Sequence, residues 1–221
     1  MTRDELLKAL YDETLVGNAP QVLALTQEGL AQGVAPEELL FEALIPSLEE
    51  VGARFERGDF FVPEMLIAGK AMAGALEILR PLLAETGVES VGTFVMGTVK
   101  GDVHDIGKNL VDIMLEGAGF RVIDLGVQVP PEKFVAAIEE HRPDIVGFSA
   151  FLTTTMPMFK ANINALEKAG LRDQVIVMVG GAPVTQEYAD AVGADGYASD
   201  ASAAVARAKE LLARRRAAAP A

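Results

Sequence analysis

Residues 90–125 read SVGTFVMGTVKGDVHDIGKNLVDIMLEGAGFRVIDL, and this stretch decides the fold class. A short apolar run at residues 90–95 leads through a glycine-rich connection into an amphipathic stretch at 106–117, and a second apolar run follows at 120–125. Short apolar runs on both sides of a helical period predict a strand–helix–strand unit, whose two strands lie parallel in one sheet. The fold class is therefore expected to be α/β.

The same alternation continues toward the C-terminal end of the chain. Further strands are predicted at residues 144–148, 174–179 and 196–198, and further helices at 131–141, 155–169, 185–192 and 201–214. Five strand–helix units predict a five-stranded, doubly wound parallel sheet of the flavodoxin or Rossmann-like type, with helices on both faces. We expect the strand order 2-1-3-4-5.

The first 87 residues differ, because their apolar residues recur at helical spacing. Four helices are predicted there, at residues 3–16, 20–32, 36–57 and 63–85. Pro46 is expected to kink the third helix, and Pro81 to loosen the last turn of the fourth. The fourth helix has an apolar stripe that needs another surface to bury it: Met65, Met72, Leu76, Leu79 and Leu83. Short connections favour a four-helix bundle, so we predict a helical domain at 1–87 and an α/β domain at 88–221.

Composition and charge exclude several classes of protein. Thirty-two acids against nineteen bases give a net charge of −13, which argues against a nucleic-acid-binding surface. The absence of Cys excludes disulfides, Cys-ligated zinc and protein-held iron–sulfur clusters. No apolar run approaches the roughly 18–20 residues of a membrane span. The acidic N-terminus does not resemble an export signal, so a cytoplasmic protein with no membrane partner is expected.

Unusual residues lie in the loops that follow the predicted strands. In doubly wound sheets, ligands bind beyond the carboxyl ends of the strands, next to the switch point between strands one and three. Glycines and hydroxyl residues collect in these loops, which suits a long cofactor that lies close to the backbone. The loops in question span residues 97–109, 149–155, 180–183 and 197–201.

Two other uses of this fold fit the loops poorly. The first loop resembles a phosphate-binding P-loop, but Gly101 and Gly107 enclose five residues rather than four, and Asn109 stands where a Ser or Thr would hold magnesium. Asp102 and Asp105 would also repel phosphate. A phosphorylation receiver would need an Asp at the end of the third strand, where Ser149 stands.

His104, between two acids in the first loop, is the candidate metal ligand. The chain has only two histidines, so a multi-His metal site is impossible, and the other, His141, lies at a predicted helix end. One His can still occupy an axial position of a metal whose other ligands come from a macrocycle. A carboxylate at Asp102 could accept the proton of the ring nitrogen that faces away from the metal. From the residues alone, a ligand and a surface histidine both remain open.

The motifs resemble those of a known family. The string Asp102-Val-His104-Asp-Ile-Gly107, followed by Ser149-Ala-Phe and by Gly180-Gly181, is similar to the Asp-x-His-x-x-Gly, Ser-x-Leu and Gly-Gly signature of cobalamin-binding proteins. Residues 55–65 resemble the helical cap that precedes the cobalamin domain in methionine synthase and in the small corrinoid proteins of methyltransferase systems.

This resemblance implies a cofactor and a role for each motif residue. The cofactor would be cobalamin, as methylcobalamin or cob(I)alamin, bound base-off and His-on with His104 as the axial ligand of cobalt. Asp102 and Thr155 would complete a relay behind His104. Phe55 and Val62 would cover the upper face of the corrin. The remaining cofactor-binding residues would be Gly101, Val103, Asp105, Ile106, Gly107, Ser149, Phe151, Thr153, Gly180, Gly181, Tyr197 and Ala201. Phe151 departs from the family's Leu, and an aromatic ring there could tighten the slot for the nucleotide tail or shift the base.

The resemblance also implies a function and its partners. It favours a methyl-carrying corrinoid protein that shuttles between a substrate-specific methyltransferase and a second methyltransferase, whose acceptor would be tetrahydrofolate or a thiol. Such a protein would have no catalytic residue of its own and would depend on a reductive activation protein. The alternatives are the cobalamin subunit of an adenosylcobalamin mutase and a cobalamin-based sensor. The upper ligand would distinguish them, since a carrier holds methyl and the alternatives hold adenosyl.

Overall fold

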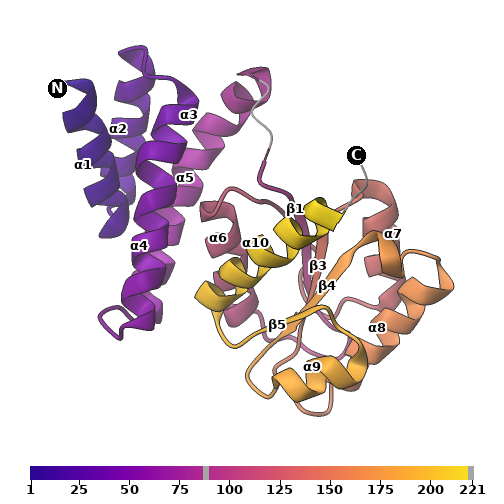
Figure 1. The fold of residues 1–221 in the computed structure, drawn as a ribbon. Coiled ribbons are helices and arrows are strands. Elements are labelled where there is room, and N and C mark those ends of the chain that lie inside the picture. The colour runs from indigo at the N-terminus through magenta and orange to yellow at the C-terminus, as the bar shows by residue number, and fades with distance from the viewer. Residues whose placement is uncertain (87–89, 219–221) are drawn as a thin grey trace. The chain divides into compact units, whose positions relative to one another are not determined.

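The computed structural model describes residues 1–86 and 90–218, except for the side chains of residues 84–86. The chain forms two compact units (Figure 1): Met1–Val91 with Glu116–Gly119, and Gly92–Leu115 with Phe120–Ala221. The domain boundary expected after residue 87 falls outside the described residues and stays a prediction. None of the described helices is both long enough and apolar enough to cross a membrane.

The first unit is helical. Its elements are α1 (Arg3–Leu15), α2 (Ala19–Ala31), α3 (Pro36–Glu38), the π-helical turn η1 (Leu39–Leu44), α4 (Ile45–Glu56) and α5 (Val62–Thr86). The Thr2 side chain caps α1 and Glu5 completes a capping box, which satisfies backbone groups that the first turn leaves free. All five residues of the apolar stripe predicted on the fourth helix are buried, as that amphipathic pattern requires.

The third predicted helix is interrupted by a π-helical turn. α3, η1 and α4 follow one another without a break, and η1 ends immediately before the first turn of α4, which contains Pro46. Proline has no N–H, and its ring clashes with the carbonyl four residues earlier, so a wider turn before it relieves the helix. The helix is thus irregular just before Pro46, and the kink expected there stays a prediction. Pro81 lies inside α5, which continues to Thr86.

The second unit is the expected parallel sheet with its helices. The strands are β1 (Thr93–Thr98), β2 (Arg121–Asp124), β3 (Ile145–Ser149), β4 (Ile176–Gly180) and β5 (Gly196–Ala198). They pair in the order β2-β1-β3-β4-β5, all parallel, which confirms the predicted topology. The helices are α6 (Ile106–Gly117), α7 (Pro131–His141), α8 (Pro157–Lys168), α9 (Gln186–Val192) and α10 (Ala201–Ala218).

Helices cover both faces of this sheet. Side chains of α7, α8 and α9 share one core with β1, β3 and β4, in which Phe134, Phe148 and Phe159 are completely buried. Phe94 and Met96 alternate with Val95 along β1 and face the other side, where Figure 1 shows α6 and α10. Both faces are therefore apolar, as in other parallel sheets covered by helices.

The first strand begins and ends three residues later than predicted. β1 was expected at residues 90–95, but Gly97 pairs with Phe148 and Thr98 pairs with Ser149 in the parallel ladder. A side chain at Gly97 would meet the Phe134 ring at 2.9 Å, so this glycine admits close packing within the sheet instead of starting the loop. The functional loop consequently begins after Thr98.

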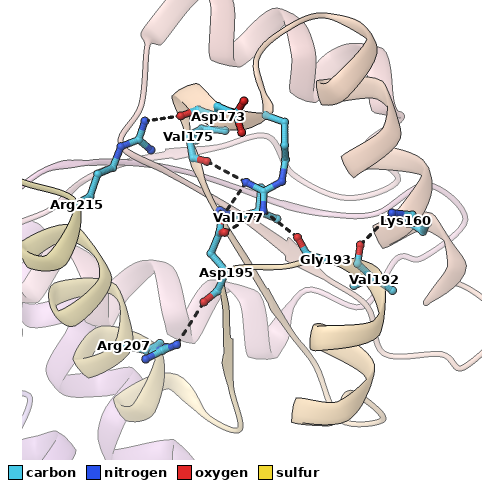
Figure 2. A network of polar contacts seen from close by, with 10 residues as sticks. Lys160, Asp173, Val175, Val177, Val192, Gly193, Asp195, Arg207 and Arg215 are labelled. Atoms are coloured by element: carbon cyan, nitrogen blue, oxygen red, sulfur yellow. Dashed lines mark hydrogen bonds and ion pairs between the residues drawn. The ribbon is translucent and has the colours of Figure 1, made fainter. Parts of the chain in front are cut away.

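A polar network fastens the amino ends of β4 and β5 (Figure 2). The Asp195 carboxylate accepts the Val177 N–H at 2.7 Å and a bidentate pair of bonds from Arg172 at 2.9 and 3.0 Å. Arg172 also donates to the Gly193 carbonyl, and Arg207 of α10 donates to the Asp195 carbonyl at 3.3 Å. These bonds anchor the amino end of the short strand β5. The loops that contain the predicted site lie at the opposite edge of the sheet, where the strands end.

Candidate functional site

Asp102 lies at the centre of the loop between β1 and α6 and accepts five hydrogen bonds. Its Oδ1 accepts from the His104 backbone N–H at 3.0 Å and faces His104 Nδ1 at 2.7 Å. Its Oδ2 accepts from the Phe151 N–H at 2.8 Å, the Leu152 N–H at 3.2 Å and the Thr155 hydroxyl at 2.7 Å. One buried carboxylate thus ties the loop after β1 to the loop after β3, across the switch point of the sheet.

These bonds keep Asp102 ionised. Burial by itself would raise the pKa of this carboxyl, but the hydrogen bonds from the His104 backbone, the Thr155 hydroxyl, the His104 ring and the Phe151 backbone outweigh it. The pKa of Asp102 therefore lies well below its usual range. An ionised carboxylate can only accept hydrogen bonds, so His104 Nδ1 must donate its proton to Asp102.

The two nitrogens of the His104 ring differ, because Nδ1 is bonded to Asp102 and Nε2 is not bonded within the described residues. With Nδ1 protonated, a neutral imidazole carries its lone pair on Nε2, and within the described residues Nε2 has no hydrogen-bond partner. The side chain is 44% exposed, and the Phe151 ring stacks on it with centroids 4.4 Å apart. The His104 ring is consequently preoriented, with Nε2 available to a ligand. No group of three or more His, Cys, Asp or Glu that could hold a metal is found in the described part of the chain.

Two further bonds fix the backbone of this loop, and sequence reasoning missed both. The hydroxyl of Thr98, a fully buried residue, donates to the His104 carbonyl at 3.0 Å, and the Gln128 N–H donates to the Asp102 carbonyl at 3.0 Å. Gly101 supplies the turn between them with a φ of 86°, which favours glycine. A polar residue at the end of an otherwise apolar strand could have indicated Thr98; nothing in the sequence pointed to Gln128.

The two loops that contain His104 and Phe151 expose large apolar side chains. Val103, Ile106, Phe151 and Leu152 are 58%, 70%, 51% and 39% exposed. Large apolar side chains gathered and exposed at one edge of a sheet mark a binding surface. A Cβ added to Gly107 would meet nothing within 4 Å, so packing within the described chain does not require glycine there. This combination fits a broad, largely apolar ring that would lie against the loop and α6.

The other predicted residues line the same edge, where β3, β4 and β5 end. Ser149 ends β3, Gly180 ends β4, and Tyr197 lies in β5, so all three lie at or next to carboxyl ends of neighbouring strands. Thr153 is exposed in the loop after β3, whereas Ala201 is buried at the start of α10. α8 starts at Pro157 rather than at residue 155, which leaves Thr155 in a turn where its hydroxyl reaches Asp102.

The local backbone of the protein requires glycine at position 181. Its φ is 130°, and a Cβ there would lie 1.9 Å from the Ala150 carbonyl oxygen. The loop after β4 therefore packs its backbone directly against the loop after β3.

In the helical unit, the two predicted covering residues lie near the α4–α5 connection. Phe55 in the last turn of α4 is half-buried, and Val62 at the start of α5 is 38% exposed. Phe61, next to Val62, is 64% exposed. None of these three side chains is fully buried in the helical unit.

Comparison with models of known protein families shows to which family the chain belongs. Residues 92–206 match the model of a B12 binding domain, and residues 6–80 match a second model that is also described as a B12 binding domain. The chain is a B12-binding corrinoid protein. The first match covers the α/β unit and the second covers the helices before it, so both halves of the chain carry the family's signature.

Relatives of this corrinoid protein match its sequence along nearly its whole length. It is 45% identical to a dimethylamine corrinoid protein of Methanosarcina barkeri, over 96% of this chain and 100% of the relative. It is 39% identical to trimethylamine corrinoid protein 1 of Methanosarcina acetivorans, over 96% of this chain and 99% of the relative.

Solved structures of corrinoid and cobalamin-binding proteins have the same fold as this chain. The methanol:cobalamin methyltransferase complex of Methanosarcina barkeri contains a chain with a TM-score of 0.84 and 29% identity, which matches over 96% of this chain and 81% of that one. A cobalamin-binding protein of Desulfitobacterium hafniense has a TM-score of 0.73 at 30% identity, over 94% and 97% of the two chains. These matches confirm the fold and the cobalamin cofactor, and they favour a methyl carrier over a mutase subunit or a sensor.

Proposed function

We propose that this corrinoid protein carries a methyl group on cobalamin, with His104 as the lower axial ligand of cobalt and the nucleotide base displaced from the metal. The observation that carries the proposal is the Asp102–His104 pair, joined at 2.7 Å with Asp102 completely buried. Asp102 holds the proton on Nδ1 and therefore presents the Nε2 lone pair, which is the arrangement a metal-ligating histidine needs.

Cobalamin, when bound, supplies the cobalt centre that accepts a methyl group and releases it again. The chain contributes ligation and control of the proton. The negative charge on Asp102 stabilises positive charge on the imidazole, and so strengthens donation from Nε2. The Thr155 hydroxyl, bonded to the far oxygen of Asp102, tunes how strongly that carboxylate attracts the Nδ1 proton. The pair can thereby release or take up a proton as the demand on Nε2 changes.

The nucleotide tail of the cofactor would run along the carboxyl edge of the sheet. β1, β3, β4 and β5 are consecutive there, and neighbouring strands are about 4.8 Å apart, so the path from His104 to β5 spans about 14 Å. Small and hydroxyl residues follow each strand along this path: Ser149, Thr153, Gly180, Gly181, Tyr197 and Ala201. We propose that they hold the tail, and that Phe55 and Val62 cover the upper face of the corrin.

The relatives indicate the partners. Because relatives named for dimethylamine and trimethylamine match nearly the whole chain, we propose a methylated amine as the methyl donor and a cognate amine methyltransferase as the first partner. The second partner would pass the methyl group to a thiol or to tetrahydrofolate, and a reductive activation protein would restore oxidised cobalt. Such low-valent cobalt chemistry requires a reducing compartment, so we place the protein in the cytoplasm.

Replacement of each of the two histidines in turn tests the ligand. In cob(II)alamin-loaded protein, an axial histidine splits the electron paramagnetic resonance signal of cobalt through its nitrogen. We expect His104→Ala to remove this splitting and to weaken cobalamin binding about 10- to 100-fold or more, since losing a ligand should cost at least what losing its supporting partner does. His141→Ala, at the end of α7, is the matched control and should behave as wild type. Nitrogen splitting that survives in His104→Ala would refute the assignment.

A further inference from the structure

Lys108 is a buried lysine four residues after His104. Its side chain is 1% exposed, although it lies in the first turn of α6 next to the exposed residues Ile106 and Gly107. Burying an ammonium group costs free energy unless charged or polar partners compensate for the lost hydration. The partners of Lys108 therefore decide what this side chain does.

The ammonium group of Lys108 has three acceptors, one for each of its N–H bonds. Nζ donates to Asp112 Oδ2 at 2.8 Å and to Asn109 Oδ1 at 2.6 Å, and it pairs with Asp124 Oδ2 at 2.7 Å. Burial lowers the pKa of Lys108, but the bonds to Asp112 and Asp124 outweigh it, so that the pKa is raised and the lysine stays charged. Because all three donors are engaged, this Gly-Lys pair is not a phosphate-binding element.

Asp124 connects Lys108 to the loop after β2. Its second oxygen, Oδ1, accepts the Gly126 N–H at 2.8 Å, and the Gly126 carbonyl accepts the Thr98 N–H at 2.9 Å. Two residues further on, the Gln128 N–H donates to the Asp102 carbonyl at 3.0 Å. The loop at 125–129 therefore supports the His104 loop at two points, at its start beside Thr98 and at its centre at Asp102.

We propose that Lys108 is a positioning residue for the cobalt ligand. Its ion pair with Asp124 fastens the loop at 125–129 to α6, and that loop holds the backbone of Asp102 in the place from which its carboxylate orients His104. The inference rests on the proposed role of His104 as ligand, but the support of the loop by Lys108 exists without cofactor and can be measured without it.

The key variant is Asp124→Asn, since this side chain is 43% exposed and Lys108 keeps its ion pair with Asp112. The amide oxygen can still accept the Gly126 N–H, but the amide N–H₂ then faces the Lys108 ammonium. Asp112→Asn is the matched control: it removes the same charge from Lys108 on the helix side and leaves the Lys108–Asp124 pair in place. Lys108→Met removes both pairs at once.

Hydrogen exchange in the cofactor-free protein tests the support of the loop. We expect Asp124→Asn to speed exchange of the Gln128 amide about five- to tenfold, and Asp112→Asn to leave it near the wild-type rate. In cob(II)alamin-loaded protein, Asp124→Asn should also reduce the fraction of cobalt with nitrogen splitting, by up to about tenfold, the lower end of what outer partners of a ligating histidine cost. Lys108→Met should match Asp124→Asn; if it fails to fold, Asp124→Asn alone decides.

Two results would overturn the inference. Wild-type exchange at Gln128 and wild-type splitting in Asp124→Asn, with only a lower melting temperature, would show that the ion pair merely stabilises α6. Equal effects of Asp112→Asn and Asp124→Asn would show that loss of charge, not the link to the loop, is responsible. If the wild-type protein itself lacks nitrogen splitting, the proposed ligation fails instead, and the Gln128 exchange still decides the role of Lys108.

Discussion

Replacing Asp102 by Asn reverses the hydrogen-bond polarity behind the metal ligand. Oδ2 accepts three bonds, from the Phe151 and Leu152 amides and the Thr155 hydroxyl, whereas Oδ1 has only His104 as partner. We therefore expect the amide oxygen to take the Oδ2 position and the amide N–H₂ to face His104. Nδ1 must then accept, so the imidazole proton moves to Nε2, where cobalt would bind.

The size of this effect follows from the bonds that must be broken. For His104 to ligate cobalt in the Asp102→Asn variant, the new bond from the side-chain amide to Nδ1 has to be lost and two donors have to face each other. An unsatisfied buried donor costs about 1–3 kcal/mol. At about 1.36 kcal/mol per factor of ten, the equilibrium between ligated and free His104 falls about 5- to 160-fold. Cobalamin should still bind, because the tail slot is untouched.

The assay is nitrogen splitting in the spectrum of cob(II)alamin-loaded protein, together with cobalamin affinity from a binding titration. Asp102→Asn should lose most of the splitting while retaining much of the affinity. Asp173→Asn is the matched control, since Asp173 is exposed in the turn before β4 and contributes its carbonyl, not its carboxylate, to the polar network. Full nitrogen splitting in Asp102→Asn would refute the argument that Asp102 sets the tautomer of His104.

Four further outcomes are expected. The lowered pKa of Asp102 stabilises the cofactor-free fold fully above the unfolded-state value of about 3.9, so the melting-temperature difference between wild type and Asp102→Asn should stay constant from pH 7 to about 5 and shrink as the pH falls further. Thr155→Val should destabilise the fold by about 1–2 kcal/mol in denaturant unfolding and reduce nitrogen splitting, whereas Thr155→Ser should restore both. Phe151→Leu removes the ring stacked on His104 and should lower the ligated fraction by less than about tenfold, with cobalamin binding intact. Gly181→Ala should cost more than about 2 kcal/mol, because its Cβ would clash with a carbonyl; Gly193→Ala, where φ is 86° and the space is open, should cost only about 1 kcal/mol.

Local patterns were sufficient for the architecture. Strand and helix periods alternate along residues 90–218, and a parallel sheet follows because each strand returns through a helix. The strand order then places every unusual loop at one edge. The separation of Asp102 and His104 by one residue already indicated a carboxylate–imidazole pair, which the structure shows at 2.7 Å. These features depend on neighbours in sequence, so sequence order alone specifies them.

Boundaries depended on packing that the sequence does not display. β1 runs through Gly97 and Thr98 because Phe134, from a helix more than thirty residues later, fills the space beside the glycine. Likewise, the π-helical turn before Pro46 reflects how a helix adapts to a proline, and its form could not be deduced from the residue type.

The sequence by itself determined the fold class, which follows from short-range periodicity, and its motifs pointed to the cofactor and to the candidate ligand through their resemblance to cobalamin-binding proteins. Only the tertiary structure decided what holds the ligand in place. Asp102 accepts hydrogen bonds from Phe151, Leu152 and Thr155, which lie about fifty residues later in the sequence. The ion pair of the buried Lys108 with Asp124 joins the first turn of α6 to the end of β2. Such contacts form only when the sheet brings separate strand ends together, because hydrogen bonds and ion pairs act over a few ångströms in space, whatever the distance along the chain.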